Sequence, residues 1–178
     1  KLLHKKRCFI PIKNEDDVCL ARAVVVAIAR LEHLTKPADK QLNRKFKNIC
    51  MGDKPKLLML QFNAAKKLMK DAGLENHTGA CGIPEIEKIQ EILKDYQIRV
   101  FNSQNCGAMV FTGPPADDVI NLYLHDEHFN VITSMPAFFD NSYYCAKCNV
   151  AYSNKENHQC GDTCPCCLAS PPCANMPY

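Results

Sequence analysis

The sequence predicts an α+β fold in which helices come first and a mostly antiparallel sheet follows. Apolar residues recur at helical spacing in the first half of the chain, whereas the second half carries short runs rich in β-branched and aromatic residues. The predicted helices cover residues 20–33, 56–72 and 84–96. The predicted strands cover residues 97–101, 107–112, 120–124 and 129–133. From residue 140 the composition changes to Tyr, Asn, Cys and Pro, so we expect a domain over 1–139 and a small module over 140–178.

Composition restricts the class of protein. The chain has 178 residues, of which 47% are hydrophobic and 23% charged, as in soluble globular proteins with a proper core. A net charge of +3 neither demands nor excludes a nucleic-acid partner. The longest apolar run, residues 23–29, is too short to span a bilayer, and the chain start lacks an initiator Met and an apolar signal core. We therefore expect a soluble piece of a longer intracellular polypeptide, in the cytoplasm or nucleus, without a membrane partner.

The first elements of the chain are predicted to place a cysteine at the N-terminus of a helix. Residues 8–12 predict a short edge strand, because Pro11 is tolerated at the edge of a sheet. The acidic turn of residues 14–17 supplies N-cap residue types ahead of the apolar run, which contains neither Gly nor Pro. Cys19 is thus expected at a helix N-terminus, where the dipole favours the thiolate needed by a nucleophile or a metal ligand. The alternative interpretation is a small buried apolar residue.

The segments between residues 40 and 84 are predicted to have structural roles. Residues 40–47 form a cationic stretch that we interpret as a solvated helix face and not as a nucleic-acid patch. Gly73 suits the C-cap of the following helix, and Pro84 suits the first turn of the next one. Cys81 also precedes a helix, but no imidazole stands at a matching spacing, so we interpret it as structural or as a wall of the site.

The later strands supply a base. Residues 120–124 and 129–133 flank the connection 125–128 and predict a hairpin. His128 and Asn130 are two apart and should share a strand face, so the Asn130 amide could hold the His128 ring as the third member of a triad does. His128 would then act as base for Cys19. His128 as a plain surface histidine, and His125 as a competing base, remain open alternatives.

The twelve cysteines are unevenly placed, with seven of them after residue 144. Clustered spacings in a chain without a secretory signal favour metal over disulfides, and hence a reducing compartment. Cys145 and Cys148 form a knuckle, and His158 with Cys160 would complete a tetrahedral zinc site, although Cys164 is also in range as the fourth ligand. Four protein ligands leave no open position, so this zinc would be structural. A second site could use Cys164, Cys166, Cys167 and Cys173.

Several of these motifs together resemble the ovarian-tumour (OTU) class of papain-like cysteine proteases. They are the Asp-x-x-Cys-Leu-x-Arg-Ala segment at 16–23, the Gly-x-x-Glu at 82–85 with the Ile-x-Val at 98–100, and the His-Phe-Asn-x-Ile at 128–132. The motifs stand in the order of the family and span roughly residues 8–134. The resemblance implies a thiol hydrolase that cleaves isopeptide bonds of ubiquitin or a ubiquitin-like modifier.

The same resemblance assigns roles to single residues. It implies Cys19 as nucleophile, His128 as base and Asn130 as the group that orients the base, with Asp16 shaping the oxyanion loop. The amides of Cys19 and of the turn 16–18 would bind the oxyanion. The chain departs from the pattern at Asp17, where the family usually has Gly, and it lacks the common aromatic residue after Cys19.

A second resemblance covers the whole chain. The Cys-Leu-Ala-Arg-Ala, Leu-His-Asp-x-His and Tyr-Tyr-Cys-x-x-Cys segments are similar to a region upstream of protein-primed family B DNA polymerases in Polinton/Maverick-type mobile elements. This resemblance implies nucleic acid as a partner through the parent polypeptide. Two alternatives to a deubiquitinase therefore stay open: a non-catalytic zinc-binding interaction or nucleic-acid-binding module of a replication protein, and a protease that processes its own polyprotein.

Overall fold

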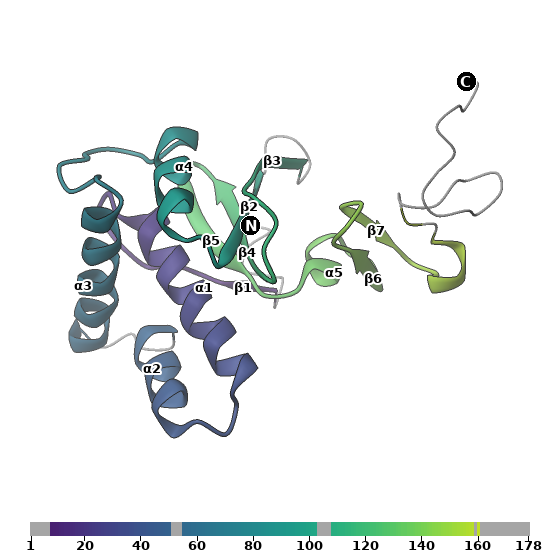
Figure 1. Ribbon diagram of the computed structural model, residues 1–178, viewed down its shortest axis with the longest axis horizontal. Helices are drawn as coiled ribbons and strands as arrows, with labels where there is room; N and C mark the ends of the chain where they lie inside the picture. The colour runs from purple at the N-terminus through teal and green to yellow at the C-terminus, as the bar shows by residue number, and fades with distance from the viewer. Residues whose placement is uncertain (1–7, 51–54, 103–107, 159, 161–178) are drawn as a thin grey trace. The chain divides into compact units, whose positions relative to one another are not determined.

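The computed structural model describes residues 8–50, 55–102, 108–158 and 160, and it has the predicted α+β class (Figure 1). The described chain forms two compact units. The first unit, Phe9–Thr133, contains the long helices and a five-stranded sheet. The second contains Cys8 and the described residues from Ser134 onward, with a two-stranded sheet. The predicted domain boundary after residue 139 stays a prediction.

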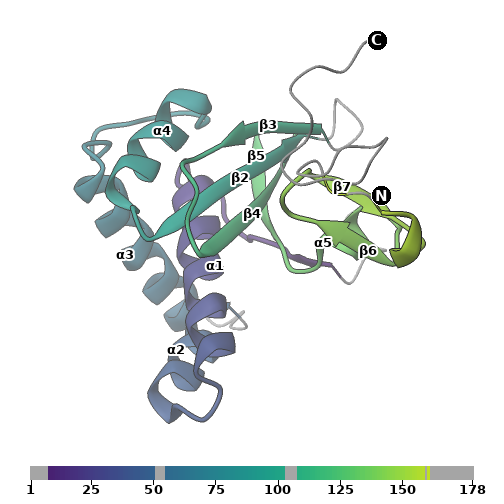
Figure 2. The same ribbon diagram turned by 45° about the vertical axis from the view of Figure 1, so that its right-hand side comes forward.

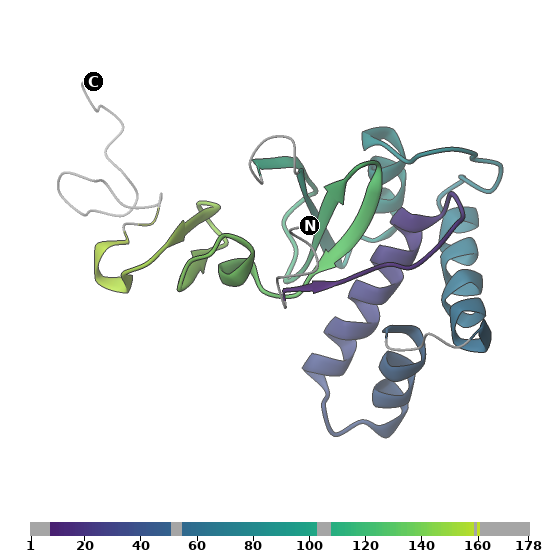
Figure 3. The same cartoon turned by 180° about the vertical axis from the view of Figure 1, so that it is seen from behind.

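The sheet of the first unit has the strand order β1-β5-β4-β2-β3. Neighbouring strands pair antiparallel, except that β2 and β4 are parallel, so the expectation of a mostly antiparallel sheet is confirmed. Figure 3 shows the short β1 beside β5, as predicted for an edge strand. The bounds are β1 (Phe9–Ile10), β2 (Tyr96–Asn102), β3 (Ala108–Thr112), β4 (Asp118–His125) and β5 (His128–Ile132).

Four helices accompany this sheet, and α1 is the central one (Figure 2). It packs against β4 and β5, while α2 and α3 pack against α1, and α4 contacts α3 and β2. Nearly every residue of the first three turns of α1 is buried, because both the sheet and the other helices cover it. The bounds are α1 (Cys19–Thr35), α2 (Lys40–Cys50), α3 (Pro55–Asp71) and α4 (Ile83–Ile92). No residue of α2 is buried, which agrees with the solvated face predicted there.

Helix α4 ends earlier than predicted, at Ile92 instead of near residue 96. Tyr96 begins β2, where it pairs with Asp118. The buried Gln90 makes this early end possible, because its Nε2 donates to the carbonyls of Leu93 and Tyr96 at 3.1 and 2.8 Å. Its Oε1 accepts from the Ile98 N–H at 2.8 Å. One amide side chain thus satisfies backbone groups of the segment that leaves α4 and enters β2.

The β4–β5 hairpin is tighter than predicted. His125 pairs with His128, so the connection is the two-residue turn of Asp126 and Glu127 and not four residues. Both turn residues have positive φ, 50° and 61°, as a type I′ turn requires. Neither is Gly or Asn, the residues that adopt this conformation at least cost. The tight turn brings His128 into the sheet as the first residue of β5.

The second unit is small. The Ser134 hydroxyl caps α5 (Met135–Phe138) by accepting from the Ala137 N–H, and strands β6 (Tyr143–Cys145) and β7 (Val150–Tyr152) form an antiparallel hairpin. A 3-10 turn, η2 (Lys155–Asn157), follows the hairpin. Within the described residues of both units, none of the helices has the length and apolar character needed to cross a membrane.

Candidate functional site

Cys19 is the first residue of α1, and its thiol lies against the β4–β5 hairpin. Its exposed fraction is 7%, and its Sγ contacts the Glu127 carbonyl oxygen at 3.8 Å, as a thiol donor would. Residue 18, and not Asp16 or Asn14, is the N-cap, and no side chain caps the helix there. The helix still begins where predicted, at Cys19. Asp16, in the turn before it, accepts a hydrogen bond from the N–H of the N-cap residue, Val18.

The thiol of Cys19 does not have the lowered pKa expected from a helix N-terminus. Burial raises its pKa most, and the negative charge of Asp16 adds to the increase. Hydrogen bonding from the backbone N–H groups of Phe129, Leu20 and Cys19 itself acts in the opposite direction. The net pKa lies above the ordinary value, since desolvation outweighs these hydrogen bonds. In this conformation Cys19 is a protonated thiol at neutral pH.

Asp16 holds the turn in front of Cys19 through Arg22. Its Oδ2 lies 2.5 Å from Arg22 Nη2, and its Oδ1 accepts from Arg22 Nε at 3.3 Å. The same Oδ1 accepts from the Val18 N–H at 3.2 Å and from Asn14 Nδ2 at 2.9 Å. Burial alone would raise the pKa of Asp16, but these bonds and the Arg22 charge hold it below its ordinary value. The Val18 amide is therefore occupied, which leaves the Asp17 and Cys19 amides of the expected oxyanion loop.

His128 and Asn130 both face Ile12, the residue that follows β1 and Pro11. The His128 Nε2 lies 2.8 Å from the Ile12 carbonyl oxygen. The Asn130 Oδ1 accepts from the Ile12 N–H at 3.1 Å. Among the described residues, no hydrogen bond joins Asn130 to His128 or His128 to Cys19, so the direct contact expected from their two-residue spacing does not form. Both nevertheless lie on β5 beside the thiol, because the residues on either side of His128 face the Cys19 sulfur.

Cys81 lies near the Cys19 thiol, and its predicted role, structural or a wall of the site, stays a prediction. It is 5% exposed, and its Sγ contacts the Asp17 carbonyl at 3.9 Å. Burial raises the pKa of Cys81 to about 12, and the nearby acidic groups of Cys19, Glu85 and Asp17 add to the increase wherever they are ionised. A thiol of this kind is a poor nucleophile. The loop that carries it is tied to the site because the Gly79 N–H donates to Asp17 Oδ2 at 2.9 Å.

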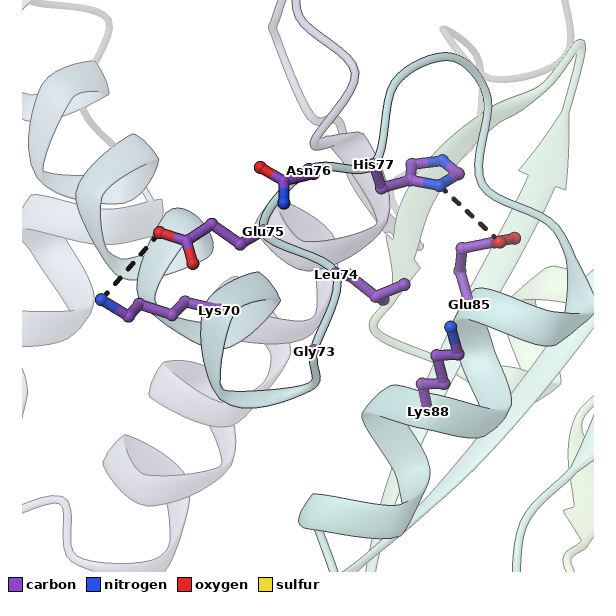
Figure 4. Close-up of a pocket in the computed structure, with 8 residues that line it drawn as sticks. All are labelled: Lys70, Gly73, Leu74, Glu75, Asn76, His77, Glu85 and Lys88. Carbon is purple, nitrogen blue, oxygen red and sulfur yellow. Dashed lines mark ion pairs between the residues drawn. The ribbon is translucent and has the colours of Figure 1, made fainter.

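A pocket of about 370 Å³ lies between the end of α3 and the start of α4 (Figure 4). Its two carboxylates, Glu75 and Glu85, are balanced by Lys70 and Lys88; Lys70 lies 3.9 Å from Glu75, and the His77 ring lies 3.7 Å from Glu85. The Glu85 carboxylate also accepts from the Gly82 N–H at 2.7 Å, which holds its pKa below the ordinary value. The pocket thus has no excess charge to select an ion, and its polar groups stabilise the loop that leads to Cys81.

The second unit gathers one cluster of metal-ligating side chains. The ligand atoms of Cys145, Cys148, His158 and Cys160 all lie within 4.8 Å of one another. The Cys145 and Cys160 sulfurs are 3.6 Å apart, and the Cys148 sulfur is 3.6 Å from His158 Nε2. The predicted site with Cys160 as its fourth ligand is therefore assembled, and it could hold a metal ion. Cys164, Cys166, Cys167 and Cys173 lie outside the described residues, so the second site stays a prediction.

The geometry of this cluster fits zinc. Ligand bonds of about 2.3 Å to sulfur and about 2.0 Å to nitrogen at tetrahedral angles place two sulfurs about 3.8 Å apart, and a sulfur and a nitrogen about 3.5 Å apart. A disulfide would instead bring two sulfurs to about 2.0 Å. The Cys148 N–H favours the thiolate of Cys145 and lowers its pKa to about 6. Tyr152 stacks on the His158 ring, with centroids 4.2 Å apart, and fixes the ring from one side.

Comparison with known proteins adds no assignment. No family model matches the chain, and no curated protein matches its sequence. The geometry therefore carries the functional interpretation. Sequence reasoning missed the main chain of Ile12, for which no side-chain pattern exists, and the Arg22 partner of Asp16. The Arg22–Asp16 pair could have been predicted, because a buried Arg requires an anionic partner and Asp16 lies six residues before Arg22.

Proposed function

We propose that this chain is a thiol-dependent hydrolase with Cys19 as nucleophile and His128 as general base. One observation supports this most directly: Cys19 begins a helix, and its sulfur lies against the backbone on both sides of His128. A buried thiol, an imidazole on the neighbouring strand and backbone amides at a helix start are the parts that acyl transfer needs. The raised pKa of Cys19 belongs to the site without substrate. Hydrogen bonds between a nucleophile and its base often shorten only when substrate binds.

The reaction would follow in two steps. The Cys19 proton moves to the His128 ring as the sulfur attacks the substrate carbonyl carbon, and the tetrahedral oxyanion is bound by the Asp17 and Cys19 amides. The C–N bond breaks, and the imidazolium gives its proton to the leaving amine. Water then gives a proton to His128 and attacks the thioester. The C–S bond breaks to release the acid, and the imidazolium returns its proton to the sulfur to restore the thiol. Asp16 acts by holding the turn through Arg22.

The substrate class that we propose is the isopeptide bond of ubiquitin or a ubiquitin-like modifier. The support is the order of the three motifs, which place Asp16, Cys19, His128 and Asn130 as in OTU-type proteases. Nothing in the geometry of the pocket region selects one modifier over another. A protease that processes its own polyprotein would use the same residues on a peptide bond.

The test is incubation with ubiquitin that carries an electrophile at its C-terminus, with the adduct read by mass. We expect an adduct on the parent chain and on Cys81→Ala, and none on Cys19→Ala. Cys81→Ala is the matched control, because it removes a second buried thiol close to the first. An adduct that survives Cys19→Ala would reject the assignment of the nucleophile. Absence of any adduct would reject this modifier as substrate.

A second candidate function rests on the metal cluster. Four ligands at Cys145, Cys148, His158 and Cys160 leave no position for water, so the ion would stabilise a small fold that has little core of its own. Such a module could serve interaction with nucleic acid or with the parent polypeptide. Salt-dependent DNA affinity, lost in the His158→Ala variant but kept in Cys19→Ala, would favour this function over hydrolysis.

A further inference from the structure

We propose that the main-chain carbonyl of Ile12, and not the side chain of Asn130, orients His128, and that Asn130 acts one step away by holding Ile12. This inference rests on the proposed roles of Cys19 and His128. It changes the third member of the site from a side chain to a backbone group. Ile12 is thereby a positioning residue, since only its main chain contacts the base.

The hydrogen bond to Ile12 determines which ring nitrogen carries the proton. A carbonyl oxygen can only accept, so the His128 Nε2, at 2.8 Å, must be the N–H. In the neutral ring the lone pair then lies on Nδ1. Nδ1 is consequently the atom that takes the proton of Cys19 when substrate brings the two side chains within reach. Once protonated, the ring keeps its bond to Ile12, because Nε2 remains a donor.

The strand register explains how two side chains reach one residue. Ile10 pairs with Val131, and continuing the antiparallel register places Ile12 opposite Phe129. His128 and Asn130 flank that position, and the ladder itself stops at Ile10 and Val131. Side chains replace the backbone hydrogen bonds that the ladder would have made at Ile12. His128 donates to the Ile12 carbonyl, and Asn130 accepts from the Ile12 N–H.

Ile12 is held firmly enough to act as such a support. Its side chain is 4% exposed and belongs to the core that contains Cys19 and Phe129. Pro11 before it restricts φ and has no N–H to compete for acceptors. Asn130 is equally buried, at 4% exposed, so its bond to the Ile12 N–H is shielded from water. The position of the Ile12 carbonyl is therefore fixed by the packing of the Ile12 side chain, by the pairing of the preceding β1 with β5, and by the hydrogen bond from the Ile12 N–H to Asn130.

The test weakens the carbonyl without changing any side chain. Replacing Lys13 by its α-hydroxy analogue converts the bond after Ile12 into an ester, whose carbonyl is a weaker acceptor. Cys19 provides the ligation junction, so a synthetic segment 1–18 can be joined to recombinant 19–178 to give the full chain. The control is the same replacement at Lys56, in the first turn of α3, introduced into the recombinant segment by amber suppression with the α-hydroxy acid.

The first readout is the tautomer of His128, measured by two-bond ¹H–¹⁵N correlation in histidine-labelled chain and assigned with His128→Gln. We expect the Nε2–H tautomer in the parent chain, in the Lys56 ester and in Asn130→Asp, whose carboxylate still accepts from Ile12. We expect the Lys13 ester to increase the share of the Nδ1–H tautomer. An Nδ1–H tautomer in the parent, or a tautomer altered by Asn130→Asp and not by the Lys13 ester, would overturn the proposal.

The second readout is the rate of adduct formation with the ubiquitin electrophile. We expect the Lys13 ester to slow it about fivefold to tenfold, the effect of losing most of one hydrogen bond, and the Lys56 ester to leave it unchanged. An unchanged rate in the Lys13 ester would overturn the positioning role. If the parent forms no adduct while His128 keeps its Nε2–H tautomer, the hydrolase function fails and the Ile12–His128 bond is still supported.

Discussion

Arg22 and Asp16 form a two-point ion pair that joins the turn before Cys19 to the helix that Cys19 begins. The guanidinium is nearly buried, with 7% of its side chain exposed, and its Nη1 also donates to the Gln61 Oε1 at 3.0 Å and to the Leu58 carbonyl at 3.3 Å. Helix α3 is thereby linked to the turn. The position of Cys19 thus depends on a contact that joins the turn, the start of α1 and the distant helix α3.

Replacing Asp16 with Asn should destabilise the first unit by about 2 kcal/mol, because it leaves the buried Arg22 charge without its anion. Asp16 is partly exposed, so the loss should be smaller than for a fully buried pair. Glu15→Gln removes a neighbouring exposed carboxylate and should change the unfolding free energy by less than about 0.5 kcal/mol. Urea unfolding followed by circular dichroism measures both. Equal effects of the two variants would contradict a specific role of Asp16.

The contribution of Asp16 should depend on pH in a defined direction. Its pKa is lower in the folded protein than its ordinary value, so the unfolded chain binds the proton more tightly. The stabilisation is then complete above about pH 4, the ordinary Asp range, and decreases as the pH falls through the folded value. The difference in unfolding free energy between parent and Asp16→Asn should therefore shrink below about pH 4. A difference that stays constant into strong acid would contradict the lowered pKa.

Cys19 in the free protein should react slowly with iodoacetamide. Because burial raises its pKa, the thiolate fraction at neutral pH is lower than in an unfolded peptide. Its alkylation rate, followed by peptide mapping, should keep rising at pH values where a cysteine in a short peptide, with pKa about 8.5, has levelled off. Denaturing the chain should increase the rate at neutral pH. A plateau below the ordinary cysteine pKa would instead indicate a thiolate that is preformed without substrate.

Removing the metal should disturb the tyrosines of the second unit. Tyr152 stacks on His158, and Tyr143 stacks on Tyr152 with centroids 5.4 Å apart. The positions of both tyrosine rings therefore depend on His158, one of the four residues that could hold the metal. We expect a chelator to change the near-ultraviolet circular dichroism of tyrosine and zinc to restore it. Elemental analysis should find one zinc fewer in His158→Ala than in the parent, and no loss in Cys50→Ser, whose thiol lies in the other unit. Equal zinc content in all three would exclude this cluster as the site.

Gly113→Ala should destabilise the sheet through Gln90. A Cβ at this position would lie 2.0 Å from the Gln90 Oε1, and Gln90 cannot move without losing its bonds to Leu93, Tyr96 and Ile98. We expect a loss of about 2–3 kcal/mol in unfolding free energy. The double variant with Gln90→Ala should lose less than the sum of the two single variants, because the clash is then gone. Additive losses would show that the two positions are independent.

The sequence by itself determined the elements that local patterns control. Apolar spacing placed the helices and strands within a few residues. The CxxC and His-x-Cys spacings predicted Cys145, Cys148 and His158 with either Cys160 or Cys164, and the structure brings the first three together with Cys160, since short loops bring such side chains together. Local patterns failed where a side chain of one element binds the backbone of the segment that follows it. The end of α4 is set by Gln90 and the strand after it, not by residues 93–96.

Only the tertiary structure decided how the candidate thiol site is built. The two-residue spacing of His128 and Asn130 correctly placed both on one strand face, but their shared partner is the main chain of Ile12, more than a hundred residues away. The dipole argument for Cys19 was likewise local, whereas its raised pKa comes from burial between α1 and the β4–β5 hairpin. Backbone acceptors and desolvation have no sequence signature, because they depend on which segments the fold brings together.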